Sequence, residues 1–177
     1  MFERYTEKAR RVIFFARYQA SQFGSSHITT EHVLLGLVRE AHVFMSSWGI
    51  PNDLAVELRA AMPPAGEKIS TSVDLPLTDA AMRVLSYSAE EAERLSHQQI
   101  GPEHLLLALL RESGTPAAEV LRKHGITAAG VRVNMSSWSG NEAIVNALRK
   151  TFAPMASRLT PEVEPAVTFS LRPGGAE

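Results

Sequence analysis

The sequence contains no cysteine among its 177 residues, which excludes disulfides and thiolate metal sites and is typical of a cytoplasmic protein. It also lacks a long apolar run. The longest, from Leu105 to Leu110, is far shorter than the about 18 residues that a membrane-spanning helix needs. Charged residues begin at Glu3, so the N-terminus has no apolar signal core. We therefore expect a cytoplasmic protein with no membrane partner.

A charge excess of either sign is missing as well. Eighteen basic residues face 19 acidic ones, so the bulk charge gives no attraction to nucleic acid. The phosphate-binding loop Gly-x-x-x-x-Gly-Lys-Ser/Thr does not occur; the nearest fragment, Gly66 to Lys68, has neither its spacing nor its partner glycine. A Gly-x-Ser-x-Gly nucleophile elbow is also missing. We expect no nucleic-acid partner, no cofactor and no enzymatic activity.

What the sequence does contain is an internal repeat. The segment from His27, HITTEHVLLGLVRE, returns from Gln99 as QIGPEHLLLALLRE, 72 positions later. Further matches at this offset lie upstream, whereas the Gly-Ile pair that closes each copy is offset by 76 positions. The first repeat is therefore four residues shorter before that point. Repeated segments of this length predict two similar units that pack against each other.

Each repeat has the pattern of helices. Thr6 is a candidate N-cap, followed by a stripe of apolar residues at three- and four-residue steps up to Gly24, a typical C-terminal stop. A second helix is predicted from Thr29 or Thr30, with its copy at Gly101-Pro102. In the second repeat, further helices are expected from Thr115-Pro116 to before Gly125 and from about Thr127.

These patterns predict an all-α protein of two pseudo-symmetric four-helix repeats with a short C-terminal extension. The first repeat covers residues 1–62, a linker rich in proline and glycine covers 63–76, and the second repeat covers 77–135. The extension, 136–177, contains one predicted helix at 141–152 and then a flexible tail.

The N-terminal MFERYTEKA, the two copies of Ile-x-x-Glu-His-x-Leu-Leu-x-Leu-x-Arg-Glu and the closing Gly-Ile pairs resemble the Clp repeat N-terminal domain, and most closely that of ClpC-type and ClpA-type unfoldases. The resemblance covers roughly residues 2 to 135 and does not extend to ATPase modules. It implies a non-catalytic module that docks substrates or adaptor proteins for a Clp ATPase. In ClpC-like proteins this domain also binds phosphorylated arginine.

The resemblance assigns the recognition carboxylates to Glu31 and Glu103, each of which is usually preceded by threonine in the family. Thr30 keeps this pattern before Glu31. Before Glu103 the threonine is replaced by Pro102, so this second site lacks the threonine hydroxyl and a backbone N–H donor. An alternative is that each glutamate simply caps its helix. The neighbouring His32 and His104 lack the spacing of a metal site, so they are interpreted as helix residues bonded to a neighbouring helix.

Two other surfaces are candidates for partners. By the pseudo-symmetry, Phe2, Arg10, Leu77 and Met82 could line a groove at the repeat junction; alternatively, Phe2 and Leu77 are hydrophobic staples or core residues. The segment 41–48, which includes Phe44, Met45 and Trp48, departs from the family and is either core or a new patch. Alternative functions are a regulatory interaction domain that has lost phosphoarginine binding, or the N-terminal fragment of a full Clp ATPase.

Overall fold

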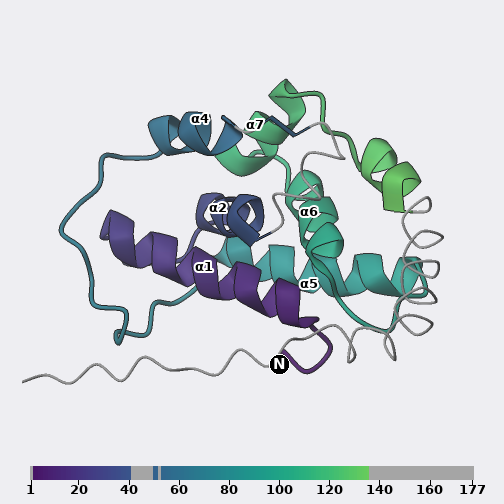
Figure 1. Ribbon diagram of the computed structural model, residues 1–177, viewed down its shortest axis with the longest axis horizontal. Coiled ribbons are helices and arrows are strands. Elements are labelled where there is room, and N and C mark those ends of the chain that lie inside the picture. The colour runs from purple at the N-terminus through teal and green to yellow at the C-terminus, as the bar shows by residue number, and fades with distance from the viewer. Residues whose placement is uncertain (1, 41–49, 52, 136–177) are drawn as a thin grey trace, which may run out of the picture. The chain divides into compact units, whose positions relative to one another are not determined.

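A computed structural model describes residues 2–40, 50–51 and 53–135 (Figure 1). These residues form helices without any extended strand, which confirms the all-α prediction. Residues 128–135 are also helical. The named helices are α1 (Glu7–Phe23), α2 (Thr30–Glu40), α4 (Leu54–Ala61), α5 (Asp79–Arg94), α6 (Pro102–Arg111) and α7 (Pro116–Lys123).

The helix starts follow the repeat. Thr6 Oγ1 accepts the Ala9 N–H at 3.2 Å before α1, and Thr78 Oγ1 accepts the Ala81 N–H at 3.3 Å before α5. These bonds satisfy backbone donors that the first turn of a helix leaves open. Gly24 ends α1 with a φ of 66°, the left-handed conformation that glycine adopts without strain. The predicted starts at Thr30, Pro102 and Pro116 are confirmed.

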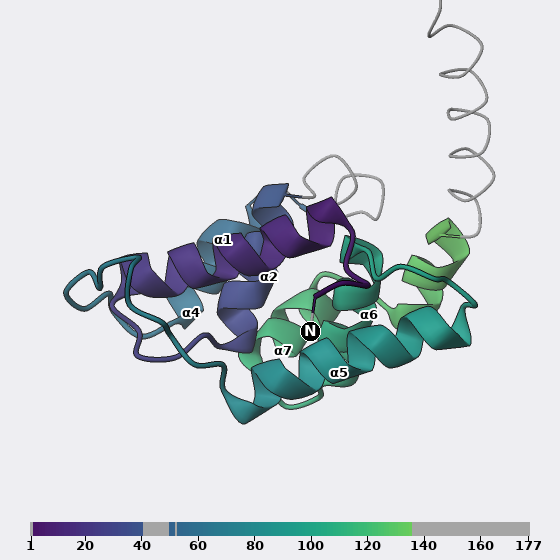
Figure 2. The same ribbon diagram turned by 90° about the horizontal axis from the view of Figure 1, so that it is seen from below.

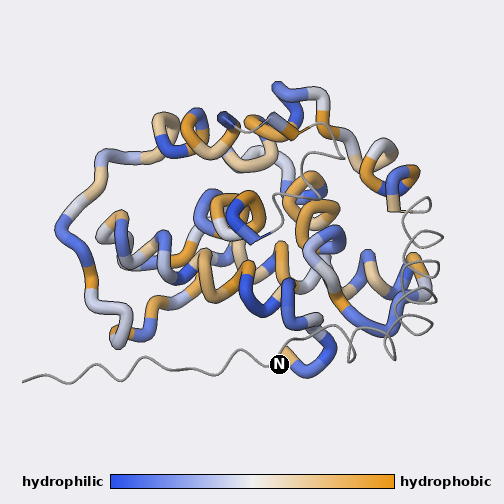
Figure 3. Tube along the Cα trace, viewed as in Figure 1, coloured by the Kyte–Doolittle hydropathy of each residue, from blue (hydrophilic) through white to orange (hydrophobic). Residues whose placement is uncertain are grey.

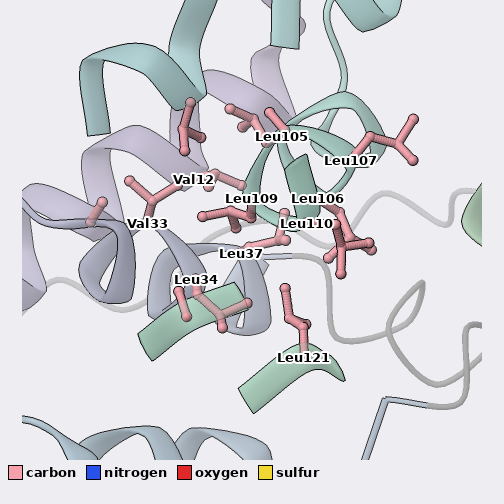
Figure 4. Packing of buried hydrophobic residues seen from close by; sticks show 14 of the residues in the cluster. Val12, Val33, Leu34, Leu37, Leu105, Leu106, Leu107, Leu109, Leu110 and Leu121 are labelled. Carbon is pink, nitrogen blue, oxygen red and sulfur yellow. The ribbon is translucent and has the colours of Figure 1, made fainter. Parts of the chain in front are cut away.

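The core is one cluster of apolar side chains from both repeats. The second helices, α2 and α6, are its centre, because nearly every one of their apolar residues is buried. Figure 3 shows apolar stretches on both helices, and Figure 4 shows their leucines beside Leu121 of α7. Burying one such leucine stabilises a fold by roughly 1.5–3 kcal/mol. Among the described residues, the leucines with no exposed surface are Leu34, Leu37, Leu54, Leu58, Leu105, Leu106, Leu109 and Leu121.

The repeats interlock through two isolated backbone bridges. Tyr5, before α1, pairs with Ile100, before α6, and Leu77, before α5, pairs with Ile28, before α2. The two bridges are related by the repeat, because both partners of one are shifted by 72 positions from those of the other. Each first helix therefore starts beside the second helix of the other repeat. Figure 2 shows α1 and α5 on opposite sides, with α2 and α6 between them.

The segment predicted as a linker, 63–76, contains no helix and is bonded along α1. The Gly66 N–H donates to the Phe23 carbonyl at 2.9 Å, and the Ile69 N–H donates to the Ser21 carbonyl at 3.0 Å. Arg17 donates to the Val73 carbonyl at 2.9 Å. The connection between the repeats is thus held to the first helix over much of its length.

Several sequence predictions lie outside the described residues. These are the altered segment 41–48 with Phe44, Met45 and Trp48, the helix at 141–152 and the C-terminal tail. Within the described ranges, none of the helices combines the length and the apolar character that crossing a bilayer requires.

Candidate functional site

The first glutamate of the repeated pair, Glu31, lies where helices of different repeats meet. Its helix, α2, begins at Thr30, and α5 begins after Thr78. The Thr78 N–H donates to the Ile28 carbonyl at 3.0 Å, which brings the N-termini of α2 and α5 together. The buried Thr30 hydroxyl donates to Glu31 Oε2 at 3.1 Å, while Glu31 itself is partly exposed. We call this place the Glu31 junction.

The second glutamate lies at the equivalent place, the Glu103 junction. Here the Thr6 N–H donates to the Ile100 carbonyl at 3.0 Å, which brings the N-termini of α1 and α6 together. Pro102 is buried and has no N–H to offer. The Glu103 carboxylate lies over Gly101, in the space that a Cβ atom on this residue would need. In the first repeat the side chain of Thr29 stands at this position.

Both junctions combine the same kinds of charge. The N-terminus of a helix has backbone N–H groups without helical partners and the positive end of the helix dipole, so it attracts anions. A carboxylate attracts a guanidinium through charge-assisted hydrogen bonds. Two helix N-termini beside one carboxylate therefore suit a small ligand that joins an anion to a cation.

The histidines cap their own helices. Nδ1 of His32 lies 3.1 Å from the backbone nitrogen of Thr29, and Nδ1 of His104 lies 2.8 Å from that of Gly101; in both cases the backbone N–H donates. Histidine thus accepts from the residue before each helix, and the interpretation of the two glutamates as additional capping groups stays a prediction. The expected bond from His32 to a neighbouring helix is wrong, since its buried Nε2 has no hydrogen-bond partner in the part of the chain that the structure describes.

Burial governs the protonation of both histidines. Loss of solvent lowers the pKa of His32 to about 4, although the charge of Glu31 opposes the shift. Burial, together with the electrostatic effect of the adjacent His97, lowers the pKa of His104 to about 4. His97 Nδ1 lies 2.9 Å from His104 Nε2. Among the described residues, no group of three or more potential ligands could hold a metal ion.

The four residues predicted for a groove are only partly brought together. Phe2 and Met82 line an apolar hollow of about 330 Å³ beside Tyr5 and Ile100. Arg10 and Leu77 are not among its lining residues. Leu77 instead pairs with the backbone before α2 and packs partly buried against the core, as the alternative of a structural role predicted.

Sequence reasoning missed the part that Thr6 and Thr78 play in the junctions. Both were recognisable as N-caps, but nothing in the pattern showed that each stands beside the second helix of the other repeat. That arrangement follows from the crossed bridges, which depend on contacts between residues distant in sequence.

Comparisons with known proteins identify related sequences. The family model described as the Clp repeat (R) N-terminal domain matches residues 76–169. The chain is 40% identical over 151 residues to "ATP-dependent Clp protease ATP-binding subunit ClpA homolog CD4B, chloroplastic" of Solanum lycopersicum, covering 81% of this chain and 16% of that protein. It is 40% identical over 153 residues to "Chaperone protein ClpC1, chloroplastic" of Arabidopsis thaliana, covering 82% and 16%.

Solved structures extend the similarity to the fold. The N-terminal domain of the chaperone ClpD from Arabidopsis thaliana has a TM-score of 0.63 and 28% identity, covering 77% of this chain and 97% of that domain. The N-terminal domain of Hsp104 from Candida albicans has a TM-score of 0.58 and 16% identity, covering 74% and 88%, and supports the fold alone. The chain spans only about a sixth of the length of the two curated relatives. Both are named as chloroplast proteins, so they give no support to a cytoplasmic location.

Proposed function

The chain belongs to the Clp repeat N-terminal domain family, and on that premise we propose that it is a non-catalytic module that docks substrates or adaptor proteins for a Clp-type unfoldase. The observation that carries this proposal is the pair of junctions, in which a repeated glutamate stands beside two helix N-termini. Neither junction combines a nucleophile with a base and a group to orient it, whereas both offer complementary charge to a ligand.

The finer proposal is that the junctions bind phosphoarginine on marked proteins. Its phosphoryl group needs hydrogen-bond donors and positive potential, which the helix N-termini offer. Its guanidinium needs a planar pair of acceptors, which Glu31 or Glu103 offers. An unmodified arginine would use only the carboxylate, and free phosphate would use only the helix ends, so both should bind more weakly.

The two junctions should differ in affinity. At Glu31, the Thr30 hydroxyl holds the carboxylate and its backbone keeps an N–H. At Glu103, proline supplies neither group, and the carboxylate is folded over Gly101. A ligand there would first have to move the Glu103 side chain. We therefore place the stronger site at the Glu31 junction.

The apolar hollow beside the Glu103 junction supports a second element of docking. Phe2 and Met82 stand on its wall, and Met82 is 53% exposed although it is apolar. An apolar side chain next to the docked residue of a peptide would fit there. Arg10 and Leu77 are not needed for this contact.

Calorimetric titration with phosphoarginine tests the proposal. We expect binding that Glu31→Ala weakens by about ten-fold or more, because the guanidinium loses its charged partner. Glu103→Ala should have the smaller effect. Glu119→Ala is the matched control, since Glu119 is an exposed glutamate in the first turn of α7 and lies at neither junction. Arginine and inorganic phosphate serve as ligand controls.

The outcomes separate the two levels of the proposal. An affinity that neither Glu31→Ala nor Glu103→Ala weakens would move the binding site elsewhere. A lack of heat at millimolar phosphoarginine, with a folded protein, would reject phosphoarginine recognition. The chain would then be the regulatory interaction domain without this activity, and its protein partners would have to be sought directly.

A further inference from the structure

Two arginines at equivalent positions of the repeats have different surroundings. In the second repeat, the Arg111 guanidinium carbon lies 4.0 Å from the ring centre of Tyr87. The same guanidinium pairs with Glu90 at 2.7 Å and lies 3.8 Å from a carboxylate oxygen of Glu91. Arg111 therefore has both an aromatic face beneath it and carboxylates beside it.

In the first repeat, Arg39 keeps the aromatic contact, but no carboxylate of the described residues lies beside it. Its guanidinium carbon lies 4.2 Å from the ring centre of Phe15 and 5.4 Å from that of Tyr18. The positions that correspond to Glu90 and Glu91 are Tyr18 and Gln19. Over the described ranges, no acidic side chain comes within ion-pairing distance of Arg39, although this arginine is exposed.

The nearby acidic residues already have cationic partners. Glu40 follows Arg39 in the chain, but its Oε1 lies 3.6 Å from Arg11 Nε. Glu7 pairs with Arg11 at 2.8 Å. The positive charge of Arg39 is thus not balanced by these neighbours.

Aromatic rings extend the surface around Arg39. Phe14 is 63% exposed and makes an edge contact with Phe15, with ring centres 5.5 Å apart. The residue equivalent to Phe14 in the second repeat is Ser86, so this exposed ring belongs to the first repeat alone. We call Phe14, Phe15, Tyr18 and Arg39 the aromatic–arginine patch. Exposed aromatic rings around an arginine are a composition enriched at the centres of protein interfaces.

We infer that the aromatic–arginine patch is a docking surface for a protein segment that presents a carboxylate next to a large apolar side chain. The second repeat indicates the chemistry of the group that would bind Arg39, because the equivalent Arg111 forms an ion pair with Glu90. In a docked segment, a carboxylate pairs with the Arg39 guanidinium as Glu90 pairs with that of Arg111, and an apolar side chain covers Phe14. A guanidinium that lies on an aromatic ring remains free to form such a pair at its edge.

This surface is separate from the Glu31 junction. Each includes a residue of α2, but Glu31 is in the first turn of this helix and Arg39 is in the last, while the aromatic residues of the patch are on α1. Eight helical residues at about 1.5 Å each place the two roughly 12 Å apart along the helix. The inference therefore does not depend on phosphoarginine binding, and either can fail without the other.

The test is an NMR titration of the full chain with the peptide Ac-Gly-Leu-Glu-Glu-Leu-Phe-Gly-NH2. Amide signals near Tyr18 and Arg39 should shift, and the affinity should fall as salt is added. A peptide with glutamine in place of both glutamates should bind about ten-fold more weakly, because it cannot form the charged pair. Equal binding of the two peptides would overturn the inference.

Three variants locate the contact. Arg39→Gln should weaken binding of the acidic peptide about ten-fold, whereas Arg59→Gln, an exposed arginine of α4, should leave it unchanged. Tyr18→Glu places a glutamate at the position equivalent to Glu90 of the second repeat. The new carboxylate should form an ion pair with Arg39 within the chain and abolish peptide binding, while the fold is kept. No shift near Arg39 at millimolar peptide, or full binding by Tyr18→Glu or Arg39→Gln, would reject the patch as a docking surface.

Discussion

At the scale of single residues, repeated motifs acquire different roles from small changes beside them. Glu31 follows a threonine that holds its carboxylate, whereas Glu103 follows a proline and folds over a glycine. Arg39 and Arg111 occupy equivalent positions, but among the described residues only Arg111 has a carboxylate within ion-pairing distance. Such differences turn two copies of one sequence motif into sites of unequal strength.

The buried histidines predict that stability depends on pH. The pKa of His32 and of His104 is about 4 in the folded chain, against an ordinary value of 6.5. Between these values the unfolded chain binds protons that the folded chain excludes, so folding is favoured less as the pH falls. The stabilisation is fully present above pH 6.5 and is lost towards pH 4, by roughly 3 kcal/mol for each histidine.

Urea unfolding between pH 7 and pH 4 measures this loss, and His104→Gln isolates one contribution. Glutamine at the same helical position can accept the Gly101 N–H but does not titrate. The variant should therefore stay folded at pH 7 and lose less stability on acidification than the natural chain. The same pH dependence in both proteins would show that His104 contributes none of it.

At the scale of elements, the first helix pair packs more closely than the second. A Cβ atom on Gly36 of α2 would collide with the carbonyl oxygen of Val12 and lie 2.9 Å from the backbone nitrogen of Ala16. The equivalent residue in α6 is Ala108, which is fully buried. Glycine thus lets α2 contact the backbone of α1, while the α5–α6 pair accommodates a methyl group.

Gly36→Ala should therefore destabilise the protein even though alanine favours helices. The added methyl group overpacks the α1–α2 contact, which costs about 1–3 kcal/mol in the free energy of unfolding. Ala108→Gly is the matched comparison; it should cost about 1 kcal/mol from helix propensity, together with a small cavity term. Chemical denaturation of both variants measures the difference. A Gly36→Ala protein more stable than the natural chain would contradict the close contact.

At the scale of the whole molecule, the repeats depend on each other. Tyr5 bridges to Ile100 of the other repeat, and its hydroxyl contacts the Leu85 carbonyl at 3.2 Å. Glu57 of α4 accepts from Lys123 and lies 2.6 Å from His124 Nε2 at the end of α7. The apolar core is shared as well, since one cluster includes side chains of both halves.

Neither repeat should fold by itself. A fragment of about 60 residues buries too little apolar surface to offset its loss of conformational entropy. Here each fragment would also lose the partner residue of both backbone bridges, because each bridge joins one repeat to the other. We expect residues 1–62 and 77–135, made separately, to show little helix by circular dichroism and no cooperative melting. The full chain should unfold in a single transition under the same conditions. A cooperative transition in either fragment would contradict this dependence.

The sequence by itself determined the repeat, the helices and the family, because local signals carry them: threonine caps, the glycine stop, apolar spacing and a duplicated Glu-His motif. Tertiary structure alone decided which elements meet. The crossed bridges place Thr6 beside the helix of Glu103, and Thr78 beside that of Glu31, through contacts between residues far apart in the chain. Whether a carboxylate of the described residues pairs with Arg39 likewise depends on which side chains surround it in space, and no local pattern encodes that.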